Sequence, residues 1–116
     1  MAYRSTHRHA RISARKVRPL ADLVRGKFAD EALDILRYQP HRGARMLEKV
    51  LKSAIGSAQD PDQNRGQSHS PDRLVVTEAH VDGGPMFKRF QPHARGQAFG
   101  ILKRTSHITV SLELLD

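Results

Sequence analysis

The sequence of 116 residues predicts an α+β fold in which three helices pack on a small antiparallel sheet and a long β-hairpin protrudes. Apolar residues recur at helical spacing three times between residues 13 and 58, and strand-like runs then cover residues 74–81 and 108–114. The segment 84–107 between these runs is basic and lacks the apolar periodicity of a core element. A hairpin whose far end leaves the body is the simplest geometry that joins the two runs.

The length of the chain allows one domain with one small core, so a deep enzymatic cleft is not expected. This single domain covers residues 1–116. Its globular body should consist of residues 1–82 and 108–116, and its extended arm of residues 83–107.

The N-terminal segment from Tyr3 to Arg11 is predicted to be an extended basic arm, because its polar residues leave no apolar face for a central strand. A first helix should follow the N-cap residue Ser13 and end at Gly26. Pro19 lies inside it, so either the helix kinks there or its regular part begins there. The apolar face of this helix carries Val17, Leu20, Ala21 and Val24.

A second, short helix is predicted to begin at the N-cap Asp30 and to end near Tyr38, where Pro40 either breaks it or opens the next helix. The third helix shows the most regular pattern, and its charged side includes the i, i+4 pair Glu48 and Lys52. Its apolar stripe consists of Ala44, Leu47, Leu51, Ala54, Ile55 and Ala58.

The even-numbered residues of the last strand should face the helices, because they are apolar and alternate with polar residues. They are Ile108, Val110, Leu112 and Leu114. The strand from Leu74 to Val81 is less one-sided. Residues 60–72, which precede it, are rich in turn-forming residues and should form an exposed loop.

The predicted hairpin is basic and contains no acidic residue between positions 84 and 107, but five cations, Lys88, Arg89, Arg95, Lys103 and Arg104. If its apex lies near Phe90, one arm of about 16 residues at roughly 3.3 Å each reaches about 50 Å. A compact chain of this length has a radius of gyration of only about 13 Å, so the arm must protrude. The residues at 83–85 are expected to bend or bulge the outgoing strand. An uncompensated basic arm needs an anionic partner.

Three phenylalanines lie in this basic segment, which is the least core-like part of the chain: Phe87, Phe90 and Phe99. Aromatic rings among basic residues can stack on unpaired bases of a nucleic acid. Stacking on bases, packing across the two arms, and burial are the alternatives that the sequence leaves open.

Positive charge is concentrated at the N-terminal end. The net charge of +8 and the sequence pI near 10.6 are typical of a nucleic-acid-binding protein. Residues 1–27 hold eight basic residues and one acidic residue, whereas residues 28–64 hold five and six and are interpreted as scaffold. Arg15 and Lys16 lie in the first turn of a helix, where positive charge opposes the helix dipole. We therefore favour phosphate contact over solvated surface charge for the basic face, Arg15, Lys16, Arg18 and Arg25.

Several classes of function are not expected. The chain has no cysteine, so disulfides and thiolate metal sites are impossible and the cytosol is the working compartment. No apolar run approaches the roughly 20 residues needed to span a bilayer, and the N-terminus lacks the apolar core of a signal peptide. His7 and His9 could share one side of a strand, but a metal site needs three or four ligands. No cofactor, metal or catalytic activity is expected, because no catalytic constellation is present.

Four runs carry a more specific signal: ISARKVRPLADLVRGK, EALDILRY, KVLKSAIGSA and VDGGPMFKRFQPHARGQAFGILKRTSHITV. In these runs the chain resembles, throughout its length, the bacterial family of large-subunit ribosomal protein number twenty-two (universal L twenty-two). The resemblance implies a structural and assembly role in the cytoplasm, within the large ribosomal subunit, with a hairpin that lines the polypeptide exit tunnel. The implied partners are large-subunit ribosomal RNA, the ribosomal proteins around the tunnel and the nascent polypeptide. Neither a membrane nor a second copy of the chain is expected as a partner.

Carried over by position, the resemblance implies RNA contacts in the body at Arg8, Arg11, Lys16, Arg18, Arg25 and Lys27. In the arm it implies contacts at Lys88, Arg89, Lys103, Arg104, Thr105, Ser106 and His107. Arg4, Arg15 and Arg95 are added to the predicted RNA-binding set, because they lie in the basic N-terminal segment and the basic hairpin. The tip implied to face the tunnel consists of Arg89, Phe90, Gln91, Pro92, His93, Ala94, Arg95 and Gly96.

The sequence departs from the family pattern at three positions. The family usually has basic residues where His93 and Gln97 stand, so this tip is less positive. It usually has an aliphatic residue where Pro19 stands.

Two rival hypotheses are weighed against the ribosomal one: an architectural DNA-binding protein with a β-arm, and a small hydrolase or nuclease.

Overall fold

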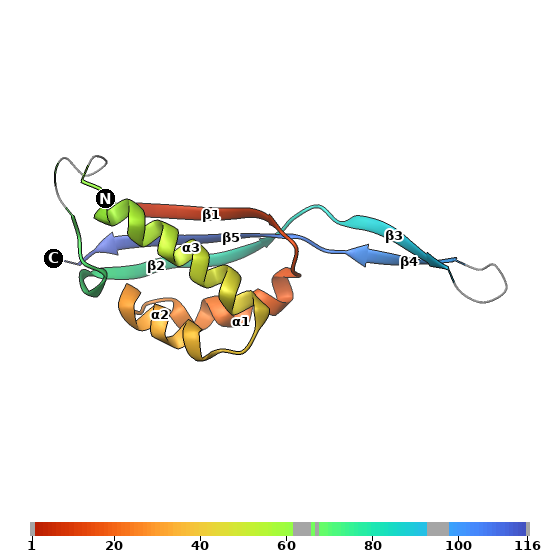
Figure 1. Cartoon of the computed structure of the whole chain (residues 1–116), viewed down its shortest axis with the longest axis horizontal. Helices are drawn as coiled ribbons and strands as arrows, with labels where there is room; N and C mark the ends of the chain where they lie inside the picture. The colour runs from red at the N-terminus through yellow and green to blue at the C-terminus, as the bar shows by residue number, and fades with distance from the viewer. Residues whose placement is uncertain (1, 62–65, 67, 93–97, 116) are drawn as a thin grey trace.

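The computed structural model describes residues 2–61, 66, 68–92 and 98–115, and its helices pack on a sheet from which a hairpin extends (Figure 1). The helices are α1 (Ala14–Val24), α2 (Ala29–Tyr38) and α3 (Arg42–Gln59), with a short 3-10 helix, η1 (Pro71–Arg73). The strands are β1 (Ala2–Ala10), β2 (Leu74–Gly83), β3 (Phe87–Pro92), β4 (Ala98–Lys103) and β5 (Ser106–Leu114). None of the described helices is long and apolar enough to cross a membrane.

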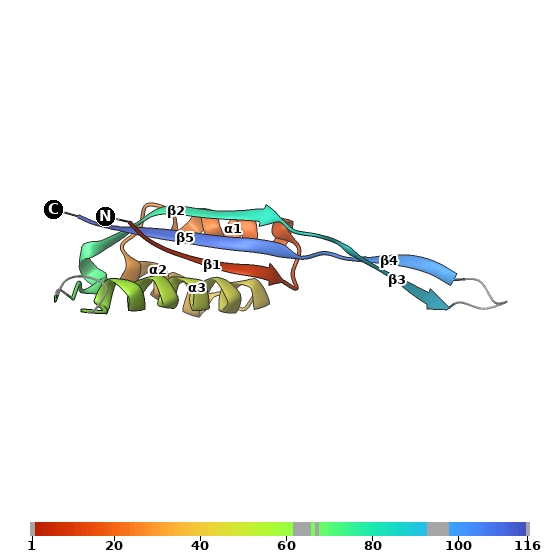
Figure 2. The same cartoon turned by 90° about the horizontal axis from the view of Figure 1, so that it is seen from above.

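Antiparallel pairing organises the described strands into a three-stranded sheet, in the order β1-β5-β2, and a separate ladder of β3 with β4. Both views show the ladder pointing away from the body along the longest axis (Figure 1, Figure 2). The molecule measures 65 × 27 × 16 Å, and its radius of gyration of 17.5 Å exceeds the about 13 Å of a compact chain. The predicted α+β fold with a protruding hairpin is confirmed. The predicted apex is wrong, because Phe90 pairs with Gly100 inside the ladder.

The N-terminal segment is not a free arm but strand β1, at one edge of the sheet. Tyr3 and Ala10 anchor it in the core. Its register against β5 shifts between His7 and Ala10, and His9 within this shift has a φ of +57°. The two histidines therefore do not follow the simple alternation that the sequence indicated. Among the described residues, no group of three His, Cys, Asp or Glu side chains could hold a metal ion.

The two faces of the three-stranded sheet differ in chemistry. As expected, the side facing the core carries Ile108, Val110 and Leu112, each 0% exposed. Ser111 and Thr109 point to the opposite face, yet they are also buried, which alternation alone did not predict. Arg4 and Glu78 pair with Ser111 from its two sides, and their side chains form an ion pair of 2.7 Å. Because β5 is the central strand, the longer side chains of Arg4 and Glu78 on its neighbours cover its small polar residues. The hydroxyl oxygens of Thr6 and Thr109 are 3.3 Å apart.

Strand β2 changes its buried face partway along. Its register against β5 shifts between Val76 and Glu78, as at a β-bulge. Leu74 and Val76 are buried before the shift, and Ala79 and Val81 after it. The shift explains why this strand looked less one-sided in sequence than its partner.

Helix α1 buries the four apolar residues predicted for it. It begins at Ala14, so its regular part does not begin at Pro19, which lies in its interior. Gly26 follows with a φ of +83°, a conformation that favours glycine. Its N–H donates to Val76 O at 2.8 Å, and the Val76 N–H donates to Lys27 O at 2.9 Å. These bonds fasten the end of α1 to β2.

Helix α2 begins at Ala29, so its N-cap residue lies two residues before the predicted N-cap, Asp30. Phe28 is the N-cap residue, because its carbonyl oxygen already accepts a bond from the Ala32 N–H at 2.8 Å. The acidic residue lies instead in the first turn, where its charge complements the helix dipole. Pro40 lies in the turn before α3, whose predicted apolar stripe is buried.

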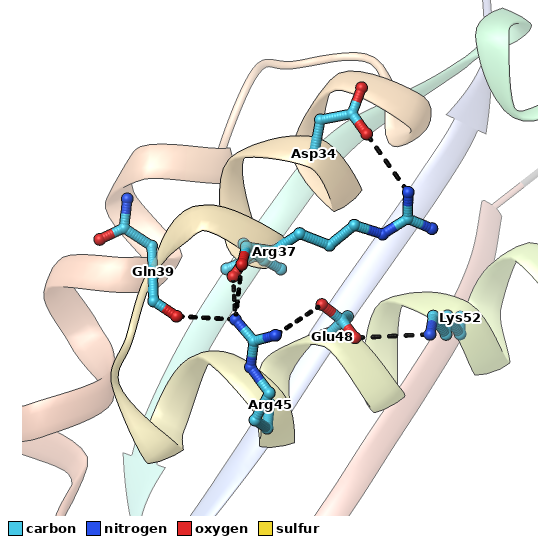
Figure 3. A network of polar contacts seen from close by, with 7 residues as sticks. Asp34, Arg37, Gln39, Arg45, Glu48 and Lys52 are labelled. Atoms are coloured by element: carbon cyan, nitrogen blue, oxygen red, sulfur yellow. Dashed lines mark hydrogen bonds and ion pairs between the residues drawn. The ribbon is translucent and has the colours of Figure 1, made fainter.

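Arg45 of α3 fastens the C-terminal end of α2 (Figure 3). Its Nη2 donates to three carbonyl oxygens, those of Leu36, Arg37 (3.3 Å) and Gln39 (2.7 Å). The last carbonyl groups of a helix have no partner within the helix, and the Arg45 side chain supplies donors to them. Its Nη1 is 3.6 Å from Glu48, which pairs with Lys52 at 3.4 Å as the i, i+4 spacing predicted. One guanidinium thus fixes the α2–α3 turn.

Gly43 allows α3 to pack closely on α1. A Cβ atom at this position would lie 3.2 Å from Val17 Cγ2 and 3.3 Å from the terminal methyl carbons of Ile12 and Leu20. A side chain larger than hydrogen has no room unless these neighbours move.

We predict that Gly43→Val lowers the free energy of unfolding by about 1–3 kcal/mol, because it overpacks this contact. Gly56→Val is the matched control, since Gly56 lies in the same helix and a Cβ there meets nothing within 4 Å. Denaturant titration of both variants measures the difference. Equal stability of the two variants would contradict the close packing of α1 and α3.

Candidate nucleic-acid interface

A basic groove lies at the end of the body from which the hairpin leaves. Three segments line its volume of about 1140 Å³: the turn and first residues of α1, the start of α3, and the end of β4. The lining residues are Arg11, Ile12, Ser13, Arg15, Lys16, His41, Arg42, Gly43, Lys103 and Arg104. None of these lining residues is acidic, so six lysines and arginines and one histidine face a shared space.

Local structure brings the three segments together. A turn closed by the bond from the Ile12 N–H to Ala10 O, at 2.8 Å, leads the chain from β1 into α1. The close approach at Gly43 places the start of α3 beside α1. Lys103 ends β4, and Arg104 connects it to the buried residues of β5. Body and arm therefore contribute to the same groove.

Two helix N-termini open onto this groove. The N-cap residues of α1 and α3, Ser13 and His41, both line it. In the described structure neither helix has a side-chain cap or an acidic residue in its first turn, whereas α2 carries Asp30 and Glu31 there. The first N–H groups of a helix and its dipole favour an anion at this end. Both helices thus present uncompensated positive ends to the groove.

The arrangement suits the phosphate groups of a nucleic acid. Like charges repel each other, by about 1 kcal/mol in water at 4 Å and by less at larger separations, so a counter-charge among the six cations is favourable. A phosphate accepts charge-assisted hydrogen bonds from lysine, arginine and free backbone N–H groups together. The chemistry available here is therefore anion binding.

Two predicted RNA-binding residues have partners at the edge of the sheet. Arg18 Nε donates to Val81 O at 3.0 Å, and Arg25 Nη2 donates to Ala79 O. Arg25 also pairs with Asp22 at 2.7 Å. These bonds fasten α1 to the edge strand β2, and RNA contact by the two arginines stays a prediction.

The remaining basic residues predicted to bind RNA are spread outside the groove. Arg8 is exposed on β1, Lys27 is exposed after α1, and Lys88 is exposed on β3. Arg4 takes part in the exposed ion pair with Glu78, which contributes at most about 1 kcal/mol. A phosphate can therefore compete for Arg4 without a large loss of stability.

The three polar residues predicted to bind RNA at the base of the arm form a junction. Thr105 and Ser106 are 4% and 0% exposed, so in this conformation their hydroxyl groups do not reach the surface. Thr105 Oγ1 donates to Pro85 O at 2.5 Å, and the Gly84 N–H donates to Thr105 O at 2.9 Å. His107 is half-buried, and its Nδ1 accepts the backbone N–H of His9 at 3.1 Å. Thr105 and His107 thus make internal hydrogen bonds, whereas the buried Ser106 Oγ has no hydrogen-bond partner within the described structure.

The predicted tunnel tip is described only in part. The backbone of Arg89, Phe90, Gln91 and Pro92 belongs to β3. The positions His93, Ala94, Arg95, Gly96 and Gln97 lie outside the described residues. The three phenylalanines of the hairpin belong to the β3-β4 ladder and not to the three-stranded sheet.

Sequence reasoning missed His41 and Arg42. They lie in the segment 28–64, whose charges nearly cancel and which was therefore interpreted as scaffold. A usable signal was present, because Pro40 marks a helix start and no acidic residue follows in the next turn. The same reasoning had identified Arg15 and Lys16 on the first helix.

We predict that Gly84→Ala destabilises the base of the arm by about 1–3 kcal/mol, because the new Cβ would crowd its neighbours. It would lie 2.6 Å from Thr105 Oγ1 and 3.3 Å from His107 Nε2. In a double-mutant cycle, Thr105→Ala removes the crowding atom, so the double variant should be more stable than the sum of the single effects implies. Strictly additive unfolding free energies would show that the contact does not constrain the junction.

Comparison with known proteins gives a consistent result. The family model described as ribosomal protein L22p/L17e matches residues 5–113. The chain is 69% identical over 114 residues to the large ribosomal subunit protein uL22 of Rhodopirellula baltica, covering 98% of this chain and 96% of that protein. It is 50% identical over 109 residues to the large ribosomal subunit protein uL22 of Caldicellulosiruptor saccharolyticus, covering 94% and 85%.

Proposed function

The chain belongs to the ribosomal protein L22p/L17e family, and from this premise we propose that it binds large-subunit ribosomal RNA through the basic groove and lines the exit tunnel with its hairpin. The family consists of structural ribosomal proteins and not of enzymes. The protein is accordingly a component of the large ribosomal subunit, in the cytoplasm.

The groove carries the proposal for RNA binding. Its cations come from the body, at Arg11, Arg15, Lys16 and Arg42, and from the arm, at Lys103 and Arg104. An RNA segment bound there contacts body and arm at once. Such a segment offsets the mutual repulsion of the cations and supplies the anion that the two helix starts lack. Holding RNA and both parts of the protein in one arrangement is an assembly role.

The hairpin carries the proposal for the tunnel. In the described structure β3 and β4 pair only with each other and extend the molecule to 65 Å. We assign residues 83–107 to an arm of a single-domain protein, with residues 1–82 and 108–116 as its body. The tip from Arg89 to Gly96 then faces the nascent polypeptide and the ribosomal proteins around the tunnel.

We predict that removing one groove cation weakens RNA binding in a salt-dependent way. Arg42→Gln or Arg104→Gln should reduce the slope of log K against log salt concentration by about 0.7–0.9, the value for one phosphate contact. The control is Arg73→Gln, an exposed arginine in η1 at the other end of the body. Filter binding of transcribed bacterial large-subunit RNA from low to high salt measures the slopes. Unchanged slopes in both groove variants would exclude the groove as a phosphate site.

We predict that a photo-crosslinking amino acid at Gln91 labels the nascent chain in stalled ribosomes, whereas the same group at Arg73 does not. Sedimentation first tests the premise, since the labelled protein should travel with the large subunit. A protein found free or on the nucleoid would overturn the ribosomal proposal in favour of the DNA-binding rival. Sedimentation with the subunit but no label from Gln91 would overturn the tunnel assignment alone.

A further inference from the structure

Tyr38, at the end of α2, has a side chain that is open to solvent, and the residue is 86% exposed. Leu23, Met86 and Leu115 range from 45% to 58%. An exposed aromatic ring keeps apolar surface in contact with water, and burying that surface against a partner is favourable. A ring this open is therefore suited to contact a molecule outside the chain.

The backbone that carries Tyr38 is held in place. The carbonyl oxygens of the residues on both sides of it, Arg37 and Gln39, accept bonds from Arg45, and so does that of Leu36 (Figure 3). Arg45 is itself fixed by its ion pair with Glu48. The ring therefore projects from a clamped turn, and ordering it against a partner costs little additional conformational entropy.

The segment that follows Tyr38 is basic. No acidic residue occurs between Asp34 and Glu48, and both of these carboxylates already pair with arginines, at 3.5 Å and 3.6 Å. His41 and Arg42, which line the groove, follow Tyr38 by three and four residues. Three residues span at most about 11 Å, so the Cα atom of Tyr38 lies within that distance of the Cα atom of His41, a residue of the groove.

We propose that Tyr38 stacks on an unpaired base of the RNA strand whose phosphates occupy the groove. The basic groove that begins at His41 favours a nucleic acid over a neighbouring protein as the partner, because a protein surface would have to be acidic to match it. Stacking on a base is sequence-tolerant and requires only an open, oriented aromatic face. The inference rests on the proposed RNA binding and adds a base contact to a site otherwise made of phosphate contacts.

Binding of transcribed bacterial large-subunit RNA by the wild type and three variants tests the proposal. Tyr38→Leu, which keeps an apolar side chain without a π-face, should weaken binding about 5- to 150-fold, the range measured for base–aromatic stacks. Tyr38→Phe should bind like the wild type, because the ring is retained. Leu115→Ala, an exposed apolar control at the C-terminal end, should also leave binding unchanged. The salt slope of Tyr38→Leu should match the wild type, since no phosphate contact is lost.

Intrinsic fluorescence gives a second readout. The chain has no tryptophan and two tyrosines, of which Tyr3 is 9% exposed in the core. In a Tyr3→Phe variant, Tyr38 is the only tyrosine, and stacking on a base should quench its emission as RNA is added. Circular dichroism and thermal melting confirm that each variant is folded.

The outcomes separate this inference from the proposed function. Wild-type RNA binding with equal affinity for Tyr38→Leu, or without quenching of Tyr38, would overturn the stacking while leaving the groove intact. A loss seen only during assembly with other ribosomal proteins, and not with RNA alone, would overturn it in favour of a protein contact. Failure of the wild type to bind RNA in a salt-dependent way would overturn the proposed function itself.

Discussion

Strand β5 is the constraint on which the described structure depends. It pairs with β1 on one side and β2 on the other, and the chain enters it directly from the returning strand of the hairpin. Residues along both of its faces are buried, so a slip of one position would move core side chains to the wrong face. The register that fixes the core also fixes where the ladder leaves the sheet. The close approach of Gly84 to Thr105 sits at this exit.

The same geometry creates the basic surface. Because β4 runs into β5, the cations at its end are brought against the helix starts, and the packing at Gly43 brings the second helix start beside the first. Charges that are distant in sequence thus meet without any carboxylate among them. The α2–α3 turn, held by Arg45, connects this surface to the exposed ring of Tyr38. The basic groove and the exposed ring therefore lie at the two ends of one short turn.

Much of the fold could be predicted from the sequence, because periodic apolar patterns report directly on which face is buried. The stripes of α1 and α3 and the alternation in β5 are examples. Features that depend on contacts between distant segments could not be predicted in this way. The burial of Ser111 requires Arg4 and Glu78 to meet above it, and α2 takes Phe28 as its N-cap in place of the better capping residue Asp30. The place of Arg42 in the basic groove could not be predicted from charge summed along the chain, because it depends on which segments meet in space.

The starts of α1 and α3, which have neither a side-chain cap nor an acidic residue in the first turn, have a consequence for copies of the protein that never reach a ribosome. A partner that binds only the folded state raises its stability by mass action. Without that partner, the helix ends at Ser13 and His41 keep their unfavourable electrostatics, and the chain opens more often. Opened chains are removed by cellular proteases, so under the proposed function the feature that recruits RNA would also expose surplus protein to turnover.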